Sequence, residues 1–261
     1  MDLGLNNKKA LVVGASRGLG AAIAQTLAKE GATVFAAARS VDKIEAWIAE
    51  LPTEVRGRVS ALQLDTGDLA QVEAVADKLL AQGGVDVLVN NTGGPPPGVA
   101  KEVRRDAWIT QFQSMAANLF HLTQRLLPPM QERKWGRIIT VASSGIEQPI
   151  PNLALSNGIR SAVLGWSKTL ANEVAADGIT VNMVLPGRIQ TERIGQLDKA
   201  NADRLNVTVE KIAQSAISQI PAGRYGAPQE FANVVAFLAG EPASYVTGSK
   251  IRIDGGATRG V

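Results

Sequence analysis

Three glycines near the start of the chain have a spacing suited to binding a phosphate group. They occur in Gly14-Ala-Ser-Arg-Gly18-Leu-Gly20, between a short apolar run and an amphipathic segment. Glycines at a strand-to-helix turn let the backbone approach a pyrophosphate, and the helix N-terminus offers free N–H groups. A tight turn that only packs helix against sheet fits the string too, but its context favours a dinucleotide site. The residues expected to contact the dinucleotide here are Gly14, Ser16, Arg17, Gly18, Leu19 and Gly20.

Two arginines stand where they could bind a further phosphate. Arg17 lies inside the glycine loop, and Arg39 follows the second predicted strand, which has no acidic residue at its end. An acidic side chain there binds the ribose 2′-hydroxyl of NAD, whereas a basic one accommodates the 2′-phosphate of NADP. Two guanidiniums can hold such a phosphate through forked hydrogen bonds. The sequence therefore favours NADP(H) over NAD(H), although exposed arginines without a ligand give the same pattern.

Short apolar runs alternate with amphipathic segments along the whole chain. Strands are predicted at 9–14, 32–38, 59–64, 85–89, 137–141, 179–185 and 250–253. Helices are predicted at 18–29, 41–51 and 68–82. Strands that alternate with helices imply parallel βαβ units. We therefore expect an α/β fold: a Rossmann-like, doubly wound parallel sheet of about seven strands with helices on both faces.

No low-complexity linker or internal repeat interrupts this alternation. The pattern predicts a single domain over residues 1–261 for both dinucleotide binding and catalysis. The least regular stretch is 188–220, which follows the sixth predicted strand and is polar. We expect it to form a pair of short helices that act as a lid over a substrate cleft.

Composition excludes several classes of function. The chain of 261 residues has no cysteine and only one histidine, His121. A disulfide scaffold, a thiolate metal site and a cysteine nucleophile are ruled out, and most zinc sites are removed, so no metal is expected. The net charge is only +3, without blocks of like charge, which disfavours nucleic acid but is compatible with an anionic small ligand. The lack of long apolar stretches and the polar N-terminus predict a cytoplasmic protein without a membrane partner.

The glycine spacing and three further strings resemble the short-chain dehydrogenase/reductase family. Asn90-Asn-Thr-Gly93 is similar to the family's Asn-Asn-Ala-Gly, and Pro186-Gly187 to its turn beside the nicotinamide. Ile253-Asp254-Gly255-Gly256 is similar to its C-terminal signature. The resemblance covers nearly the whole chain and implies that further residues contact the cofactor: Asp65, Asn91, Gly93, Pro186, Gly187 and Ile189. Asp65 would lie against the adenine amine, but it also suits a turn or helix cap.

Part of the chain is most similar to the β-ketoacyl-carrier-protein reductase branch of that family, namely 136–141, 167–171 and 223–230. Family members reduce a carbonyl with a tyrosine as general acid, a lysine four residues later, a serine and an asparagine. The serine position is Ser143 here, and the tyrosine position, thirteen residues further on, is Ser156. The lysine position is Arg160 and the asparagine position is Met115. The resemblance thus implies a divergent branch with an atypical catalytic tetrad formed by Ser143, Ser156, Arg160 and Met115.

These replacements change how the site could handle a proton. A phenol can be tuned toward neutral pH by a cation, whereas the aliphatic hydroxyl of Ser156 is a much weaker acid. Arg160 cannot be deprotonated, but it can stabilise an oxyanion or hold the ribose or an anionic substrate. The only tyrosines, Tyr225 and Tyr245, lie far along the chain. Glu147 is a candidate surrogate acid if burial raises its pKa, although a solvated loop carboxylate is favoured because glutamate is seldom buried.

Three functions remain open, and all of them use NADP(H). The first is reduction of a 3-oxoacyl thioester or similar carbonyl, with the proton handled by Ser143, Ser156, Arg160 or a water. The second is altered chemistry on a strongly acidified substrate, and the third is a non-catalytic NADP(H)-binding sensor or partner subunit. The arginine pair 104–105 and the basic pair 133–134 could also attract an acidic carrier protein.

Two segments predict self-association. Segments 116–130 and 159–175 carry apolar residues over much of their surface, and a helix that is apolar on more than one face is buried somewhere. In the family that the chain resembles, these helices pair with their copies. The resemblance therefore implies a homodimer or homotetramer.

Overall fold

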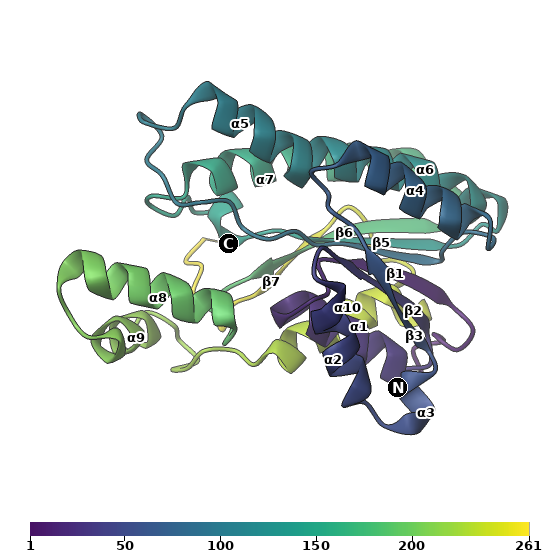
Figure 1. Ribbon diagram of the computed structural model, residues 1–261, viewed down its shortest axis with the longest axis horizontal. Coiled ribbons are helices and arrows are strands. Elements are labelled where there is room, and N and C mark those ends of the chain that lie inside the picture. The colour runs from purple at the N-terminus through teal and green to yellow at the C-terminus, as the bar shows by residue number, and fades with distance from the viewer. Residues whose placement is uncertain (261) are drawn as a thin grey trace.

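One parallel sheet runs through the centre of the molecule in the computed structural model, which describes residues 1–260 (Figure 1). Neighbouring strands lie in the order β3-β2-β1-β4-β5-β6-β7, and all pairs are parallel. This confirms the predicted Rossmann-like sheet. The strands are β1 (Lys9–Val13), β2 (Thr33–Ala38), β3 (Val59–Gln63), β4 (Val87–Asn90), β5 (Gly136–Val141), β6 (Ile179–Pro186) and β7 (Lys250–Ile253).

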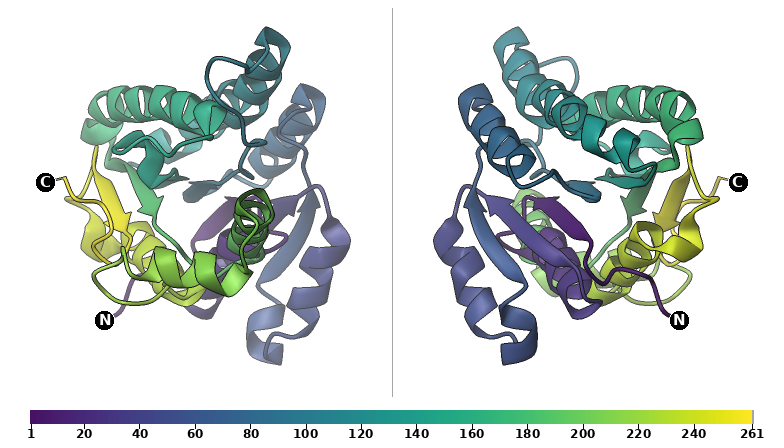
Figure 2. Two further views of the ribbon diagram at one scale, coloured as in Figure 1. Left: turned by 90° about the vertical axis from the view of Figure 1, so that its left-hand side faces the viewer. Right: turned by 90° about the vertical axis from the view of Figure 1, so that its right-hand side faces the viewer.

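Helices cover both faces of the sheet, as Figures 1 and 2 show. One face carries α1 (Gly18–Lys29), α2 (Val41–Ala49), α3 (Thr53–Arg56) and α10 (Pro228–Ala239). The other carries α4 (Leu69–Leu80), α5 (Arg105–Phe112), α6 (Asn118–Glu132) and α7 (Ala154–Val174). Short turns are η1 (Gln113–Ala117), η2 (Ser144–Ile146), η3 (Ala175–Asp177) and η4 (Glu241–Ala243). The stretch expected to be a helix pair forms α8 (Glu192–Leu205) and α9 (Val209–Ile217).

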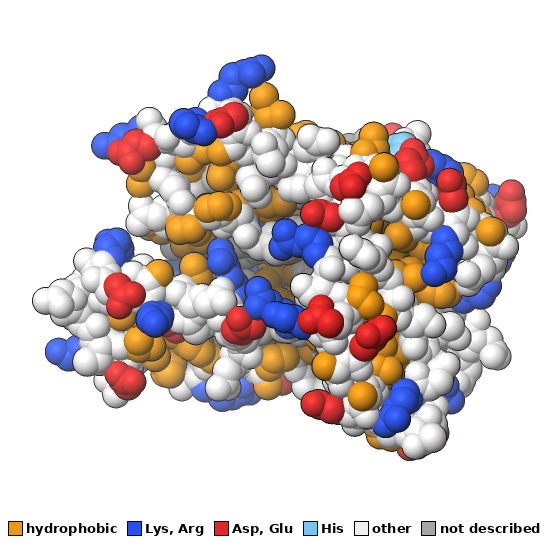
Figure 3. Space-filling view, viewed as in Figure 1, with side chains coloured by type: hydrophobic (Ala, Val, Ile, Leu, Met, Phe, Trp, Pro, Cys, Tyr) orange, Lys and Arg blue, Asp and Glu red, His pale blue; other side chains and the backbone are white. Residues whose placement is uncertain are grey.

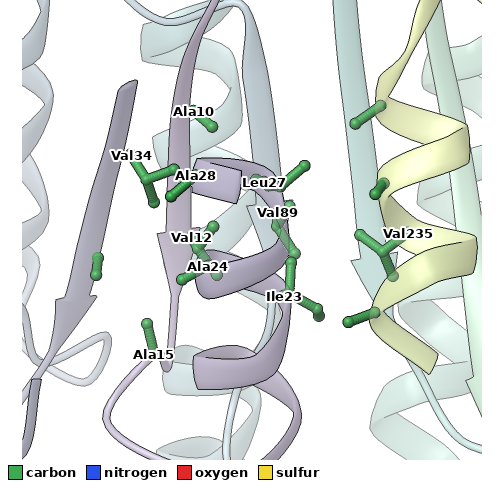
Figure 4. Packing of buried hydrophobic residues seen from close by; sticks show 14 of the residues in the cluster. Ala10, Val12, Ala15, Ile23, Ala24, Leu27, Ala28, Val34, Val89 and Val235 are labelled. Carbon is green, nitrogen blue, oxygen red and sulfur yellow. The ribbon is translucent and has the colours of Figure 1, made fainter. Parts of the chain in front are cut away.

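Strand side chains alternate between two hydrophobic cores because successive residues of a strand point to opposite faces. On β1, Ala10 and Val12 join the core beneath α1 and α10, while Leu11 and Val13 join the core beneath α4 and α6. Figure 4 shows the first core, with several side chains of α1 directed at the sheet. Burial on both faces explains why these strands read as continuous apolar runs rather than as alternating ones.

The chain reverses its direction of travel across the sheet after β3. The strands β1, β2 and β3 follow one another toward one edge, whereas β4, β5, β6 and β7 follow one another toward the other. The turns after β1 and β4 therefore diverge and leave a crevice at the carboxyl ends of the strands, where ligands of open α/β sheets bind. Several expected element ends differ from the observed ones by one or two residues; β4, for example, begins at Val87 rather than at residue 85.

One guanidinium is fully buried beneath this framework. Arg137 of β5 is 1% exposed, and it donates hydrogen bonds to the carbonyls of Gly136, Gly178 and Gly240 at 2.9, 3.3 and 3.2 Å. The guanidinium also lies 4.3 Å from the centre of the Trp135 ring. Arg137 thus links β5 to the segments before β6 and after α10.

We predict that Arg137→Met lowers the free energy of unfolding by about 3 kcal/mol, because carbonyls buried around the guanidinium lose their donor. Chemical denaturation measures the change. Arg105→Met is the control, since Arg105 is exposed at the start of α5 and its replacement should alter stability by less than about 0.5 kcal/mol. Equal stabilities of the two variants would contradict the structural role of Arg137.

Candidate active site

The turn between β1 and α1 leaves no space for a Cβ at Gly14 or Gly20. Gly14 and Gly18 have positive φ values of 68° and 58°, which glycine adopts without strain. A Cβ on Gly20 would lie 2.2 Å from the carbonyl oxygen of Gly14. The N-cap residue, Arg17, makes no side-chain capping hydrogen bond, so α1 begins with first-turn N–H groups suited to an anion.

The end of β2 lies beside this glycine loop. The Ala15 N–H donates to the carbonyl of Ala37 at 3.1 Å, two residues before Arg39. Arg39 is exposed there, and so is Arg17, whose guanidinium forms an ion pair with Glu192 of α8 at 2.7 Å. The structure thus brings both predicted phosphate-binding arginines to the same loop region, with one of them already paired.

The end of β3 is the next neighbour along the sheet. The Leu64 N–H donates to the carbonyl of Ala38 at 3.0 Å, which positions the next residue, Asp65, beyond the ends of β2 and β3. Asp65 is partly buried and its carboxylate accepts a hydrogen bond from the Gly67 N–H at 2.9 Å. Asp65 therefore stabilises a turn before α4. This turn role is the alternative to contact with the adenine amine.

The loop after β4 is tied to the glycine loop by Asn91. Its amide donates to the carbonyls of Val13 and Gly14, both at 3.2 Å. Two residues later, Gly93 is exposed. These contacts set the width of the crevice between the β1 and β4 turns, where Asn91 and Gly93 are expected to contact the cofactor.

The turn after β6 forms another wall of the candidate site. Gly187 donates to the carbonyl of Ile253 at 3.0 Å, and a Cβ on Gly187 would lie 2.6 Å from Cα of Asp254. The Pro186-Gly187 turn is thus packed against the C-terminal signature without space for a larger residue. Ile189 is buried just beyond it, and α8 begins three residues later.

The two serines of the expected catalytic set occupy different surroundings. Ser143 follows β5, and its Oγ accepts a hydrogen bond from the Gly145 N–H at 3.1 Å. Because a hydroxyl both accepts and donates, its proton remains able to bond a ligand oxygen. Ser156 lies in the first turn of α7 and is 7% exposed. Arg160 follows one turn later, on the same face of that helix.

Arg160 points inward rather than toward open solvent. Its guanidinium donates to the carbonyl of Val141, at the end of β5, at 2.8 Å, and to that of Thr92, after β4, at 3.4 Å. Burial lowers the pKa of Arg160 to about 10, so the group is still charged at neutral pH. It therefore holds two loops of the site together and supplies a fixed positive charge.

A small cavity of about 10 Å³ lies behind Arg160 and also borders on Met115. Met115 is buried within the π-helical turn η1, a local geometry frequent at functional sites. The side-chain oxygens of Asn90 and Thr140 are buried without hydrogen-bond partners, and both residues line the same cavity. Arg160 and Met115 thus line the same cavity, whereas Ser143 and Ser156 lie outside this lining.

Glu147 does not have the properties of a surrogate acid. Its side chain is 7% exposed and forms ion pairs with Lys250 and Arg252 of β7, so it is not a solvated loop carboxylate either. The Arg252 guanidinium holds the pKa of the Glu147 carboxyl below its usual range, despite burial. Glu147 is therefore ionised at neutral pH and joins the loop after β5 to the last strand.

Sequence reasoning missed the polar contacts of α8. Thr191 caps this helix by accepting from the Ile194 N–H at 3.4 Å, and a Cβ on Gly18 would lie 3.6 Å from its methyl group. Asp198 is buried, with Arg188 at 2.5 Å and the Tyr225 hydroxyl at 2.9 Å. The sequence signal that could have indicated the start of α8 is Thr191 before a polar run, because threonine is a preferred N-cap residue.

The basic pairs suggested as attractants for a carrier protein are mostly engaged within the chain. Arg104 forms an ion pair with Asp106 at 2.5 Å, and Lys134 with Asp177 at 2.5 Å. Arg133 donates to two backbone carbonyls between α4 and β4. These contacts reduce the positive potential that an acidic partner would meet at these positions.

The surface is hollowed between α8 and α9 on one side and α5 and α7 on the other (Figure 3). Lys and Arg side chains gather along this hollow in the same view, which suits an anionic ligand. Within residues 1–260, no group of three or more His, Cys, Asp or Glu residues could hold a metal ion. The same part of the chain contains no helix that is long and apolar enough to cross a membrane.

We predict that Gly20→Ala weakens NADPH binding about 10-fold or more, because an added Cβ cannot fit without moving the loop, and such overpacking costs about 1–3 kcal/mol. Isothermal titration calorimetry measures the dissociation constant. Gly165→Ala is the matched control, since a Cβ there, in the middle of α7, meets no atom within 4 Å. It should leave NADPH binding unchanged, and wild-type affinity of Gly20→Ala would refute the role of the loop.

Comparisons with known proteins agree with this geometry. Residues 14–258 match the family model described as enoyl-(acyl carrier protein) reductase. The chain is 36% identical over 257 residues to the 3-oxoacyl-[acyl-carrier-protein] reductase FabG of Escherichia coli, covering 97% of this chain and 98% of that protein.

Solved structures show the same fold. L-sorbose reductase from Gluconobacter frateurii, complexed with NADPH and L-sorbose, superposes with a TM-score of 0.93 at 33% identity over all of both chains. A variant of actinorhodin polyketide ketoreductase with NADPH superposes with a TM-score of 0.90 at 32% identity, covering 97% of this chain and 98% of that one. The chain belongs to the short-chain dehydrogenase/reductase family.

Proposed function

We propose that this protein is an NADP(H)-dependent oxidoreductase that reduces a 3-oxoacyl thioester or a similar small-molecule carbonyl by hydride transfer. The observation that carries the proposal is that contacts join three turns at the carboxyl ends of the strands. Asn91 fixes the β4 turn to the glycine loop, and Thr191 brings the segment after β6 over the same loop. The reductase names of the relatives, among them one for 3-oxoacyl-carrier-protein, support the substrate class.

The described residues fit an NADP(H) molecule. The glycine loop and the first turn of α1 suit the pyrophosphate, and Arg17 and Arg39 suit the 2′-phosphate. Asp65 would accept from the adenine amine, while Asn91, Gly93 and the 186–189 turn would contact the nicotinamide half. When bound, the cofactor supplies the hydride. NADPH in the named structures of relatives supports this choice over NAD(H).

Ser143 and Arg160 would stabilise the developing charge. The Ser143 hydroxyl can donate a hydrogen bond to the substrate oxygen while it accepts one from the Gly145 N–H. Arg160 supplies a fixed positive charge and holds the β4 and β5 loops in place, but it cannot give up a proton. Ser156 or a water would deliver the proton, and Met115 would contribute only apolar packing. Loss of a phenolic general acid slows such a step by about 10²–10⁴-fold, while orientation by the site is retained.

A second candidate function is a non-catalytic NADP(H)-binding sensor or partner subunit. The observation that favours it is that the residues at the tyrosine, lysine and asparagine positions are Ser156, Arg160 and Met115. The glycine loop and its contacts are separate from these side chains, so cofactor binding does not require turnover. Both candidates predict NADPH binding, and only the first predicts its consumption.

We further propose that the protein is a homodimer or homotetramer with α8 and α9 as a lid over the cleft. Ile109 and Phe112 of α5 are 48% and 40% exposed, which supports a covered face beside α7 in the assembled protein.

For the assembly, we predict a dimeric or tetrameric mass at micromolar concentration, as measured by light scattering. A monomeric mass would contradict the assembly.

The proposed activity predicts measurable NADPH consumption by the wild-type protein on a panel of carbonyl substrates that includes 3-oxoacyl thioesters. The comparison is a variant that restores the family residues by Met115→Asn, Ser156→Tyr and Arg160→Lys. We expect slow turnover by the wild type and turnover about 10²-fold faster by the restored variant, because it regains a general acid. Circular dichroism and NADPH affinity check that the variant is folded.

Other outcomes separate the two candidate functions. Turnover only by the restored variant would support the sensor, since fold and pocket would then be intact without the chemistry. Tight NADPH binding without consumption by either protein would contradict carbonyl reduction on this panel. Faster turnover by the wild type than by the restored variant would indicate that Ser156 and Arg160 support a different proton route.

A further inference from the structure

The start of α8 brings a carboxylate to the phosphate-binding end of α1. Thr191 packs over Gly18 and caps α8, so Glu192 stands in the first turn of that helix. Both oxygens of the Glu192 carboxylate lie close to Nη1 of Arg17, at 2.7 and 2.8 Å. The Gln196 amide donates to the same carboxylate at 3.0 Å, which fixes its orientation.

This ion pair is accessible to a ligand. The side chains of Arg17 and Glu192 are 53% and 56% exposed, so an incoming phosphate can reach the guanidinium without opening a core. Exposed pairs of this kind contribute little stability and are readily exchanged. An ordinary phosphate monoester carries a charge of about −1.5 to −2 at neutral pH, more than a carboxylate. It can therefore displace Glu192 from Arg17, and the two anions repel if both stay near the same guanidinium.

We propose that Glu192 sets the affinity and selectivity for the cofactor by competing with the 2′-phosphate of NADP(H) for Arg17. The inference rests on the proposed use of NADP(H) and adds a residue to that site. NAD(H) has a hydroxyl in place of this phosphate and leaves the ion pair intact, whereas the phosphate of NADP(H) competes with Glu192 for the guanidinium. Glu192 thus lowers the preference for NADP(H) and links binding of its phosphate to loss of the Arg17 contact at the start of α8.

The rest of α8 is held by a separate set of contacts. Asp198, 3% exposed, accepts from Arg188 at 2.5 Å and from the Tyr225 hydroxyl at 2.9 Å. These partners belong to the segments after β6 and before α10, not to the glycine loop. Breaking the Arg17–Glu192 pair therefore removes one of the links between the start of α8 and the glycine loop, while Asp198 keeps the helix on the protein.

The test compares dissociation constants of NADPH and NADH for the wild type, Glu192→Gln, Arg17→Ala and the double variant, each measured by calorimetry. Glu192→Gln should tighten NADPH binding about 2- to 5-fold, the equivalent of an exposed ion pair, and leave NADH binding unchanged. Arg17→Ala should weaken NADPH binding about 10-fold, as expected for a lost charged hydrogen bond. In the Arg17→Ala background, Glu192→Gln should have no effect.

Glu210→Gln is the charge control, because Glu210 is an exposed acid in the first turn of α9; it should leave both affinities unchanged. An equal gain for NADPH and NADH, a gain that persists without Arg17, or a gain matched by Glu210→Gln would each overturn the competition. If NADPH binds and depends on Arg17 but Glu192→Gln changes nothing, the inference fails and the proposed cofactor stands. If the wild type binds no NADPH, the proposed function fails and the inference fails with it.

Discussion

The ligand-binding end of the sheet depends on a backbone contact with no space for a side chain. Gly20 approaches the carbonyl of Gly14 so closely that a Cβ would overlap it, and the Asn91 amide bonds that same carbonyl from the neighbouring turn. This contact fixes where α1 begins relative to β1 and β4. Because the two turns diverge at the reversal of strand order, their separation defines the crevice in which a dinucleotide would lie.

The opposite wall of the site depends on Arg160. Its hydrogen bonds to Val141 and Thr92 join the ends of β5 and β4 through one planar group. Five N–H donors in a fixed plane suit this bridging better than the single flexible ammonium of a lysine. The guanidinium nevertheless stays charged at neutral pH, because burial lowers the pKa of Arg160 only to about 10. The residue that orders the loops is therefore unable to act as the acid.

Local patterns account for what the sequence predicts well. Doubly buried strands and the glycine turn are each encoded within a few consecutive residues, so the sheet and the loop follow from the sequence. Contacts between side chains that are distant in sequence cannot be predicted in this way. Arg17 and Glu192 are 175 residues apart, and Glu147 meets Arg252 across 105 residues. No local signal reveals that Glu147 is buried and ionised, since its environment is supplied by the last strand.

The contacts of helix α8 are also difficult to predict from the sequence. A helix is expected there because the segment is polar and has few turn signals, but the faces that the helix presents depend on tertiary contacts. Asp198 is buried within a helix whose sequence is mostly polar, because Arg188 and Tyr225 satisfy its carboxylate. A buried carboxylate without such partners would be strongly destabilising. The contacts that anchor α8 through Asp198 can thus be recognised only when the fold brings three separate segments together.

In the proposed function, cofactor binding and proton transfer consequently rest on different parts of the molecule. The β1, β4 and β6 turns would position the cofactor, whereas the first turns of α7 carry Ser156 and Arg160. A change of side chain on α7 need not disturb the glycine loop, so a protein can keep its nucleotide while its acid is replaced. A weaker acid most restricts substrates whose oxygen must gain a full proton as the hydride arrives. Carbonyls that are already polarised depend least on that acid, and in the proposed reaction Ser143 and the Arg160 charge would supply the oxyanion stabilisation that they require.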